Sequence, residues 1–84
     1  MPRLSRDLDK ALAALGGAVS EARRERELTQ EELAQRVGLH ESYISVIESG
    51  RRNPTWGVVR RISQALEMPF PELVRRAEEL ERKL

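Results

Sequence analysis

The stretch from Thr29 to Gly50 constrains the fold most, because it predicts two short helices that are joined at a glycine. Thr29 is followed three residues later by Glu32, which is the capping-box pattern that marks the start of a helix. Gly38 can adopt the left-handed backbone conformation that ends this helix. A second helix is predicted to begin at Glu41, and Gly50 should close it.

Apolar side chains recur at helical spacing in both predicted helices, so each helix has one face for a core. These inner residues are Leu33, Ala34 and Val37 in the first helix, and Ile44 and Ile47 in the second. The small side chain of Ala34 permits the close crossing of two helices that a helix-turn-helix requires.

A helix is also predicted near the N-terminus, where four apolar residues fall at spacings of four, three and four. They are Leu8, Leu12, Leu15 and Val19. Ser5 is the predicted cap, and Asp7 and Asp9 would lie in the first turn, where the helix dipole favours anions. The pair Gly16–Gly17 interrupts the apolar face, and each interior glycine costs about 1 kcal/mol relative to alanine. We expect a kink, a break or a close packing contact there.

Two more helices are predicted after residue 50. Thr55 should cap the first, whose inner residues are Val59, Ile62 and Leu66. The segment Met68–Pro69–Phe70–Pro71 breaks this helix, because proline cannot continue it. The last helix has the same apolar spacing as the first, at Leu73, Ala77, Leu80 and Leu84. The predicted fold is therefore all-α, with five helices in a single domain that spans residues 1–84.

Composition restricts the chemistry that the chain can perform. The sequence has no cysteine, which excludes a disulfide, a thiolate metal site and a thiol nucleophile. His40 is its only histidine, so we expect no metal, no cofactor and no enzyme activity. Neither a signal-peptide pattern nor an apolar run of membrane-spanning length occurs, which predicts a cytoplasmic protein without a membrane partner. Nothing in the sequence indicates a small-molecule ligand.

Charge is informative through its distribution. The 15 basic and 14 acidic residues leave a formal net charge of +1, which alone does not indicate a nucleic-acid partner. Most basic residues are arginines, whose guanidinium groups can bind phosphates and bases with two hydrogen bonds at once. Arginine pairs occur at Arg23–Arg24, Arg51–Arg52, Arg60–Arg61 and Arg75–Arg76. For the last two pairs, solvated helix faces are the favoured interpretation.

Residues 15–73 resemble the Cro/C1-type, or XRE-type, helix-turn-helix domain of phage repressors and bacterial regulators. The resemblance rests on residues at fixed spacing: Leu15–Gly16, Arg23, Leu28 to Ala34, Gly38, Tyr43–Ile44–Ser45, Ile47–Glu48, Gly50, Arg52 and Pro54–Thr55. It implies a five-helix, lambda-repressor-like DNA-binding domain with extended N- and C-terminal helices. The motif itself would comprise residues 30–49, and residues 74–84 would form a C-terminal helix extension.

The resemblance also implies roles for individual residues on DNA. In such domains the second motif helix lies in the major groove and the first crosses the phosphate backbone. The residues at or beside the base-reading positions are Glu41, Ser42, Tyr43, Ser45 and Val46. The residues implied to contact phosphates are Gln30, Arg51, Arg52, Asn53 and Trp56.

Three of these positions keep an alternative interpretation. Glu41 would be repelled by phosphates unless it accepts a hydrogen bond from a cytosine or adenine amine, so it is alternatively a first-turn charge held by an arginine such as Arg51. Trp56 is alternatively a partly buried packing residue. His40 occupies the position before the second motif helix, where it would be an imperfect cap or a neighbour of a phosphate.

Arg23 and Glu48 match a structural ion pair of the family, which connects the first helix to the end of the recognition helix. The family binds two-fold DNA sites as dimers. Ala77, Leu80 and Leu84 extend beyond the predicted core and are the expected homodimer contact, with packing against the chain's own N-terminal helix as the alternative.

The expected function is therefore a sequence-specific, double-stranded DNA-binding transcriptional regulator, most simply a dimeric repressor that reads a two-fold operator and associates with the nucleoid when bound. The alternative is a protein-interaction adaptor or an antitoxin-like partner protein that uses the same scaffold. Near-neutral net charge and Glu41 favour this alternative slightly. Salt-dependent DNA binding distinguishes the two functions.

Overall fold

The computed structural model describes residues 2–84, and their side chains from residue 6 onward. It contains α1 (Pro2–Glu25), α2 (Gln30–Val37), α3 (Glu41–Glu48), α4 (Trp56–Ala65) and α5 (Phe70–Arg82). Within the described residues there are five helices and no strand, so the predicted all-α, five-helix fold is confirmed. None of these helices is long and apolar enough to cross a membrane.

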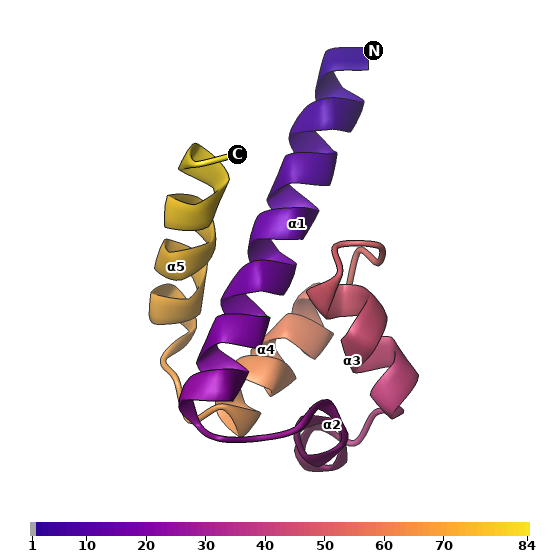
Figure 1. The fold of residues 1–84 in the computed structure, drawn as a ribbon, viewed down its shortest axis with the longest axis vertical. Coiled ribbons are helices and arrows are strands. Elements are labelled where there is room, and N and C mark those ends of the chain that lie inside the picture. The colour runs from indigo at the N-terminus through magenta and orange to yellow at the C-terminus, as the bar shows by residue number, and fades with distance from the viewer. Residues whose placement is uncertain (1) are drawn as a thin grey trace.

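The longest helices, α1 and α5, lie side by side in opposite directions, so both chain ends lie at the same end of the molecule (Figure 1). The shorter helices α2, α3 and α4 lie beside the C-terminal half of α1. The N-terminal half of α1 projects beyond them, which gives the molecule its elongated shape of 37 × 22 × 20 Å.

The start of α1 differs from the prediction. The helix begins at Pro2, so Ser5 is not its cap, and Asp7 and Asp9 lie beyond its first turn. Proline is favoured at the first position of a helix, because its missing N–H has no partner there in any case. The apolar spacing begins only at Leu8, and it therefore gave no signal for the turns that precede it. Leu8 itself is 48% exposed.

The surroundings of Gly16 show which of the three expectations for the glycine pair, a kink, a break or a close packing contact, is correct. α1 runs through both glycines as one helix, and the backbone of α3 ends against the first. A Cβ on Gly16 would lie 2.4 Å from the carbonyl oxygen of Ile47 and 2.5 Å from that of Glu48. The interruption of the apolar face is therefore a close packing contact between two helix backbones.

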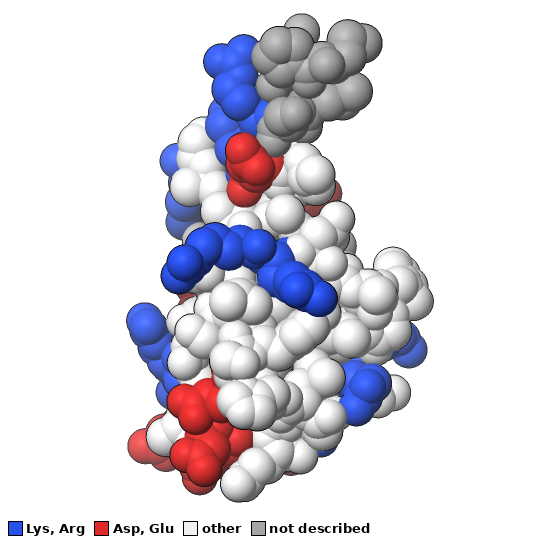
Figure 2. Space-filling view, turned by 90° about the vertical axis from the view of Figure 1, so that its right-hand side faces the viewer, with Lys and Arg blue, Asp and Glu red and all other residues white. Residues whose placement is uncertain are grey.

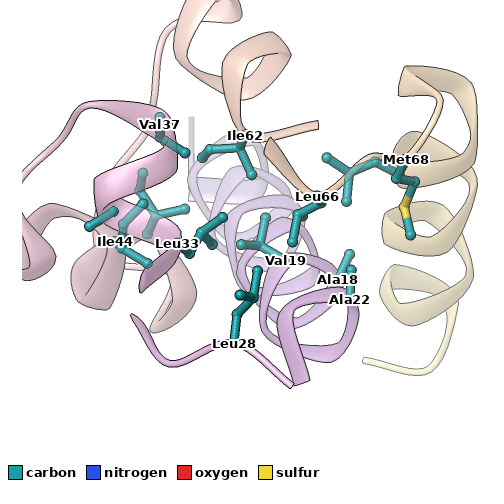
Figure 3. Packing of buried hydrophobic residues seen from close by; sticks show 13 residues of the cluster. Ala18, Val19, Ala22, Leu28, Leu33, Val37, Ile44, Ile62, Leu66 and Met68 are labelled. Carbon is teal, nitrogen blue, oxygen red and sulfur yellow. The ribbon is translucent and has the colours of Figure 1, made fainter. Parts of the chain in front are cut away.

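The core joins α1 to the short helices (Figure 3). Its largest fully buried side chains are Val19, Leu33, Ile44, Ile47, Ile62, Leu66 and Leu73. All of these except Val19 come from the four helices after α1 or from the end of α4, and α1 supplies mainly alanines. Small side chains on α1 let the other helices approach its axis closely.

The predicted helix boundaries of the motif are confirmed by the caps. The Thr29 hydroxyl accepts from the Glu32 N–H at 3.0 Å, and the Glu32 carboxylate accepts from the Thr29 N–H at 2.9 Å. Gly38 and Gly50 adopt positive φ angles of 80° and 77°. Thr55 caps α4 as predicted, by accepting from the Val58 N–H at 3.2 Å.

The apolar residues of α5 are used mainly within the chain. Leu73 is fully buried, and Ala77 and Leu80 pack partly buried against the core, where Leu80 lies over Gly17 of α1. Ala77 and Leu80 therefore pack against the chain's own N-terminal helix, which was the alternative to a dimer contact. They can do so because α1 continues far enough to cover them. Leu84 remains 59% exposed and free to contact a second chain.

Two arginines, Arg26 and Arg61, stabilise the fold by capping the C-terminal ends of helices. Arg26 donates to the carbonyl oxygens of Leu66 and Glu67, at 2.6 and 3.2 Å, at the end of α4. Arg61 donates to the carbonyl oxygen of Val37 at the end of α2. Guanidinium groups suit these positions, because the last carbonyls of a helix have no partner within it and carry the negative end of the helix dipole.

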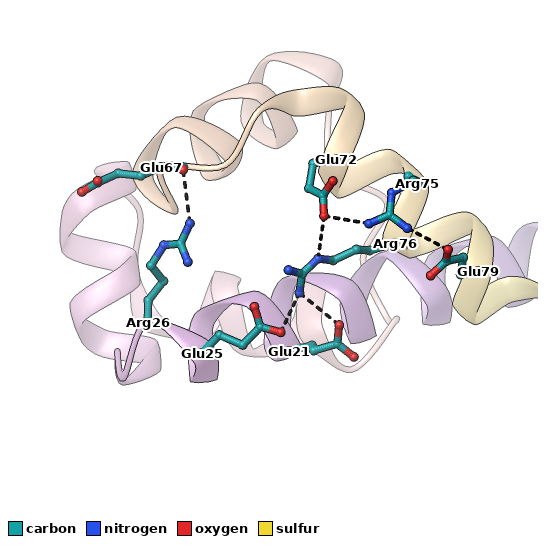
Figure 4. A network of polar contacts seen from close by, with 8 residues as sticks. All are labelled: Glu21, Glu25, Arg26, Glu67, Glu72, Arg75, Arg76 and Glu79. Carbon is teal, nitrogen blue, oxygen red and sulfur yellow. Dashed lines mark hydrogen bonds and ion pairs between the residues drawn. The ribbon is translucent and has the colours of Figure 1, made fainter.

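Arg75 and Arg76 belong to an ion-pair network between α5 and α1 (Figure 4). Arg76 contacts Glu21 and Glu25 of α1 at 3.1 and 2.7 Å and Glu72 of its own helix at 3.4 Å. Arg75 pairs with Glu72 at 2.8 Å and with Glu79 at 2.7 Å. Arg75 therefore lies on a solvated helix face, as the sequence favoured, whereas Arg76 does not, because only 20% of its side chain is exposed and its ion pairs join α5 to α1.

The network predicts a loss of stability in acid. The carboxyl pKa values of Glu25 and Glu72 are lowered, chiefly by hydrogen bonds from Arg76 and Arg75 respectively. A carboxylate whose pKa is lowered by folding stabilises the fold above its unfolded-state pKa, and this contribution is lost as the pH falls through the folded-state pKa. We therefore expect the Tm to fall as the pH is lowered from about 5 to below 4.

Thermal unfolding of the Arg76→Gln variant, followed by circular dichroism across this pH range, measures the contribution of the network. The variant should melt lower than the parent at neutral pH and lose less Tm in acid. Arg82→Gln is the matched control, because Arg82 is on the same helix and forms no ion pair among the described residues. Equal acid sensitivity in the parent and in Arg76→Gln would contradict the assignment.

Candidate nucleic-acid interface

The outer face of α3 is polar and accessible. Ile44 and Ile47 are buried on the inner face, at 0% and 1% exposure. With 3.6 residues per turn, Ser42, Ser45 and Val46 lie on the opposite side, where Ser42 is exposed and the other two are partly exposed. α3 is thus held by its apolar side while short side chains face outward.

Ser49 is a member of this face that the sequence reasoning missed. It is exposed, lies one turn after Ser45, and follows the last residue of α3. Its hydroxyl donates to the carbonyl oxygen of Val46 at 3.0 Å and accepts from Nε of Arg51 at 3.2 Å. The helical spacing from Ser42 and Ser45 was the signal that could have found it.

His40 caps the N-terminal end of α3. Its ring atom Nδ1 accepts from the Ser42 N–H at 3.1 Å and lies 2.8 Å from the Ser42 hydroxyl oxygen. Of the two interpretations of this residue, the structure supports the cap. An imidazole nitrogen here replaces the oxygen of the serine, threonine, asparagine or aspartate that usually caps a helix.

Glu41 projects from the first turn of α3 and is exposed. It forms no ion pair with Arg51, whose Nε instead binds Ser49. The interpretation of Glu41 as a charge held by Arg51 is therefore wrong, because Arg51 binds Ser49 at the C-terminal end of α3, and Glu41 lies at its N-terminal end. The carboxylate of Glu41 remains accessible at the start of α3.

Tyr43 and Arg52 form the flank of α3. Tyr43 is partly buried against the core, and the guanidinium carbon of Arg52 lies 5.0 Å from the centroid of its ring. Such a cation–π contact holds the arginine beside the helix while its N–H groups stay exposed. Arg52 is thereby oriented next to α3, although it comes from the following loop.

Arg23, Glu48 and Gln30 form a hydrogen-bonded group that connects α1, α3 and α2. Nε and Nη2 of Arg23 donate to the two carboxylate oxygens of Glu48 at 2.7 and 3.0 Å, and both side chains are at least 90% buried. Hydrogen bonding by Glu48 raises the pKa of Arg23. Arg23 also donates to the carbonyl oxygen of Leu28 at 2.7 Å. The buried guanidinium group of Arg23 and the carboxylate of Glu48 are therefore both paired and hydrogen-bonded.

Gln30 has a partner that the sequence reasoning did not predict. Its side-chain amide donates to Glu48 at 3.0 Å. This bond uses one of the two amide hydrogens, so the second is available for a phosphate at the N-terminal end of α2. Glu48 thus positions Gln30 as well as Arg23.

The loop after α3 carries the remaining predicted contacts. Arg51, Arg52 and Asn53 are exposed, and Trp56 is 71% exposed, which excludes the partly buried packing role. The Trp56 ring makes an edge contact with Phe70, with 4.8 Å between ring centroids. Viewed from the side of α3, basic side chains cross the middle of the surface, and an acidic cluster lies at its lower end (Figure 2).

Two short helices joined at a left-handed glycine, with an exposed polar face on the second, define a helix-turn-helix protein. The sequence model of the helix-turn-helix family matches residues 19–73, and the chain belongs to this family. The resemblance to the Cro/C1-type, or XRE-type, domain is thereby confirmed.

The relatives agree with this assignment. The uncharacterised helix-turn-helix-type transcriptional regulator y4dJ of Sinorhizobium fredii is 43% identical over 60 residues, which are 71% of this chain and 78% of that protein. The restriction-modification controller protein C.AhdI of Aeromonas hydrophila is 34% identical, with a TM-score of 0.72 over 74% of this chain and 94% of its own.

The clp gene regulator ClgR of Corynebacterium glutamicum is similar in fold. Its crystal structure has a TM-score of 0.83 and covers 86% of this chain and 77% of its own, at 24% identity. At that identity the similarity extends to the fold alone. Its high TM-score over most of this chain agrees with the five-helix arrangement described above.

Proposed function

We propose that this protein is a sequence-specific DNA-binding transcriptional regulator, which acts in the cytoplasm as a dimeric repressor on a two-fold operator. The observation that carries the proposal is the exposed polar face of α3, opposite its buried isoleucines and fixed at both ends by His40 and Glu48. A helix held in this way can enter the major groove without losing its contacts to the core. The names of the relatives support a regulatory role.

The residues at or beside the base-reading positions would be Glu41, Ser42, Tyr43, Ser45 and Val46. Serine hydroxyls can bind base edges, a carboxylate can accept from the amine of cytosine, and Val46 can pack on a thymine methyl group. Tyr43 is partly buried on the flank of α3, so its hydroxyl would contact the backbone next to the bases.

Phosphates would be bound on both sides of α3. Gln30 offers an amide N–H at the N-terminal end of α2, where the helix dipole also favours an anion. Arg51, Arg52 and Asn53 offer donors from the loop after α3, and the indole N–H of Trp56 offers another. Contacts of this kind fix the position of the recognition helix on the duplex and carry no sequence information directly.

A second copy of the chain would complete the binding site. A dimer places two recognition helices about one helical turn of DNA apart. Exposed apolar side chains on and after α5 support this proposal, because Val74 is 40% exposed one turn after the partly exposed Phe70, and Leu84, beyond the end of the helix, is 59% exposed. Sedimentation of the intact chain and of a Val74→Asp variant tests it, and unchanged association in the variant would exclude the side of α5 that carries Val74.

The salt dependence of DNA binding tests the proposal against a protein-binding adaptor. The acidic cluster on the side of α3 and the net charge of +1 are the observations that favour the adaptor. For a DNA-binding protein, we expect log K to fall linearly with log salt, with a slope of about 0.9 per neutralised phosphate. The change in the fluorescence of Trp56, the only tryptophan, on addition of DNA provides the binding signal.

Two arginine variants make this measurement specific. Arg52→Gln should reduce the slope by about 0.9 if Arg52 contacts one phosphate. Arg75→Gln is the matched control, because Arg75 pairs with Glu72 and Glu79 on α5, and it should leave the slope unchanged. Absence of salt-dependent binding at low salt would favour the adaptor or an antitoxin-like partner protein.

A further inference from the structure

The contacts of His40 with Ser42 determine where the protons lie at the start of the recognition helix. Nδ1 of His40 is 3.1 Å from the backbone nitrogen of Ser42. A backbone N–H can only donate, so Nδ1 must be the unprotonated nitrogen of the ring. The ring proton of neutral His40 is therefore on Nε2.

This tautomer fixes the orientation of the Ser42 hydroxyl. The hydroxyl oxygen lies 2.8 Å from the same Nδ1 atom. Because Nδ1 carries no proton, the hydroxyl is the donor in this contact, and it shares the single lone pair of Nδ1 with the Ser42 N–H. A serine hydroxyl has one proton and two lone pairs. With that proton used inside the chain, Ser42 presents only an acceptor to an approaching ligand.

The side chain of Glu41, next to Ser42, likewise presents only acceptors. Glu41 is exposed in the same turn, and an ionised carboxylate can only accept hydrogen bonds. At the other end of α3, the hydroxyl of Ser49 also donates within the chain, to the carbonyl oxygen of Val46 at 3.0 Å. Glu41 and Ser42, in the first turn of α3, thus offer acceptors to a ligand, and neither has a proton that is free to donate.

We propose that His40 is a positioning residue for base recognition, which makes Ser42 an acceptor that reads an amino group in the major groove, N4 of cytosine or N6 of adenine. This inference rests on the proposed DNA-binding function. Guanine and thymine present the acceptors O6 and O4 at the corresponding edge. A serine acceptor opposite these atoms would meet a second acceptor, unless its hydroxyl breaks the bond to His40 and rotates.

Base-pair preference in the operator tests the inference, with the intact protein and DNA selected from a random library. The base pair read by Ser42 is the one whose preference Ser42→Ala abolishes. There we expect the parent protein to favour an amino-bearing base by about tenfold in Kd. His40→Ala should reduce this preference to below about threefold, because the freed hydroxyl can donate or accept.

A conservative variant separates positioning from helix capping. In His40→Asn the side-chain oxygen can accept from both the Ser42 N–H and the Ser42 hydroxyl, so the preference should return. Loss of the cap alone would weaken binding to all four base pairs alike. Full preference in His40→Ala, or a parent preference for the guanine or thymine edge, would overturn the inference while leaving DNA binding established.

The tautomer of His40 provides a test that needs no DNA. Nitrogen NMR of the free protein at a pH where His40 is neutral should show Nδ1 unprotonated and Nε2 protonated. A proton on Nδ1 would overturn the inference, because the Ser42 hydroxyl would then be free to donate. Failure of the proposed function would look different, since the intact protein would bind no DNA at all.

Discussion

Replacing Glu48 with alanine is expected to lower the free energy of unfolding by about 3 kcal/mol or more. The substitution removes two of the three acceptors of the Arg23 guanidinium group, whose Nε and Nη2 bind the carboxylate at 2.7 and 3.0 Å, and leaves only the carbonyl oxygen of Leu28. Arg23 is only 9% exposed, so water cannot replace these bonds. Gln30 would lose its partner as well. Chemical denaturation, followed by circular dichroism, measures the effect.

Arg24→Ala is the matched control for this variant. Arg24 is next to Arg23 on α1 but is exposed, so its removal should change stability by less than about 0.5 kcal/mol. A second variant, Glu48→Gln, keeps the size of the side chain and removes its charge. Its loss of stability should lie between the losses in Glu48→Ala and Arg24→Ala. Similar losses of stability in Glu48→Ala and Arg24→Ala would show that the buried pair does not hold α3 to α1.

Gly16→Ala is expected to be the other strongly destabilising substitution, with a loss of about 3 kcal/mol or more in the free energy of unfolding. Its new methyl group would lie 2.4 and 2.5 Å from the carbonyl oxygens of Ile47 and Glu48. Backbone atoms cannot rotate away as a side chain can, so α3 must move as a whole. We expect this variant to lose cooperative thermal unfolding or to melt far below the parent.

The adjacent glycine provides the control. A Cβ on Gly17 would meet only Cδ1 of Leu80, at 3.2 Å, which is the end of a flexible side chain. Gly17→Ala also gains about 1 kcal/mol of helix propensity, so it should melt near or above the parent. Equal destabilisation by the two substitutions would contradict a specific contact between α1 and α3 at Gly16.

The sequence predicted the helix-turn-helix motif well because its signals are local. A capping box involves residues three apart, and a left-handed glycine ends a helix by its own backbone freedom. The boundaries of α2 follow from Thr29, Glu32 and Gly38 without any knowledge of the rest of the chain. The apolar spacing likewise identified which faces of these helices are buried.

The features that sequence reasoning missed depend on contacts between distant segments. The capping of α2 by Arg61 and of α4 by Arg26 joins residues 24 to 40 positions apart. The partial burial of Ala77 and Leu80 within the chain, which the sequence offered only as the alternative to a dimer contact, required α1 to extend far enough to cover them. The start of α1 at Pro2 was missed for another reason, since no apolar spacing marks its first turns.

The candidate site shows the same division. Residue type and helical position placed Ser42, Ser45 and Val46 on the outer face, where the structure has them. Sequence could not show that the Ser42 hydroxyl is bound to His40, because histidine is an unusual cap and its tautomer depends on geometry. The chemistry that a side chain offers to DNA therefore depends on its neighbours as well as on its identity.

Selection of binding sites from random DNA by the intact protein tests whether the outer face of α3 reads a two-fold operator. We expect an enriched sequence with two symmetric half-sites whose centres are about one helical turn, or roughly 10 base pairs, apart. We also expect that a variant with Ser42, Ser45 and Val46 all replaced by alanine folds but enriches no such sequence. Absence of enrichment with the parent protein, or an unchanged site with the triple variant, would contradict base reading by the outer face of α3.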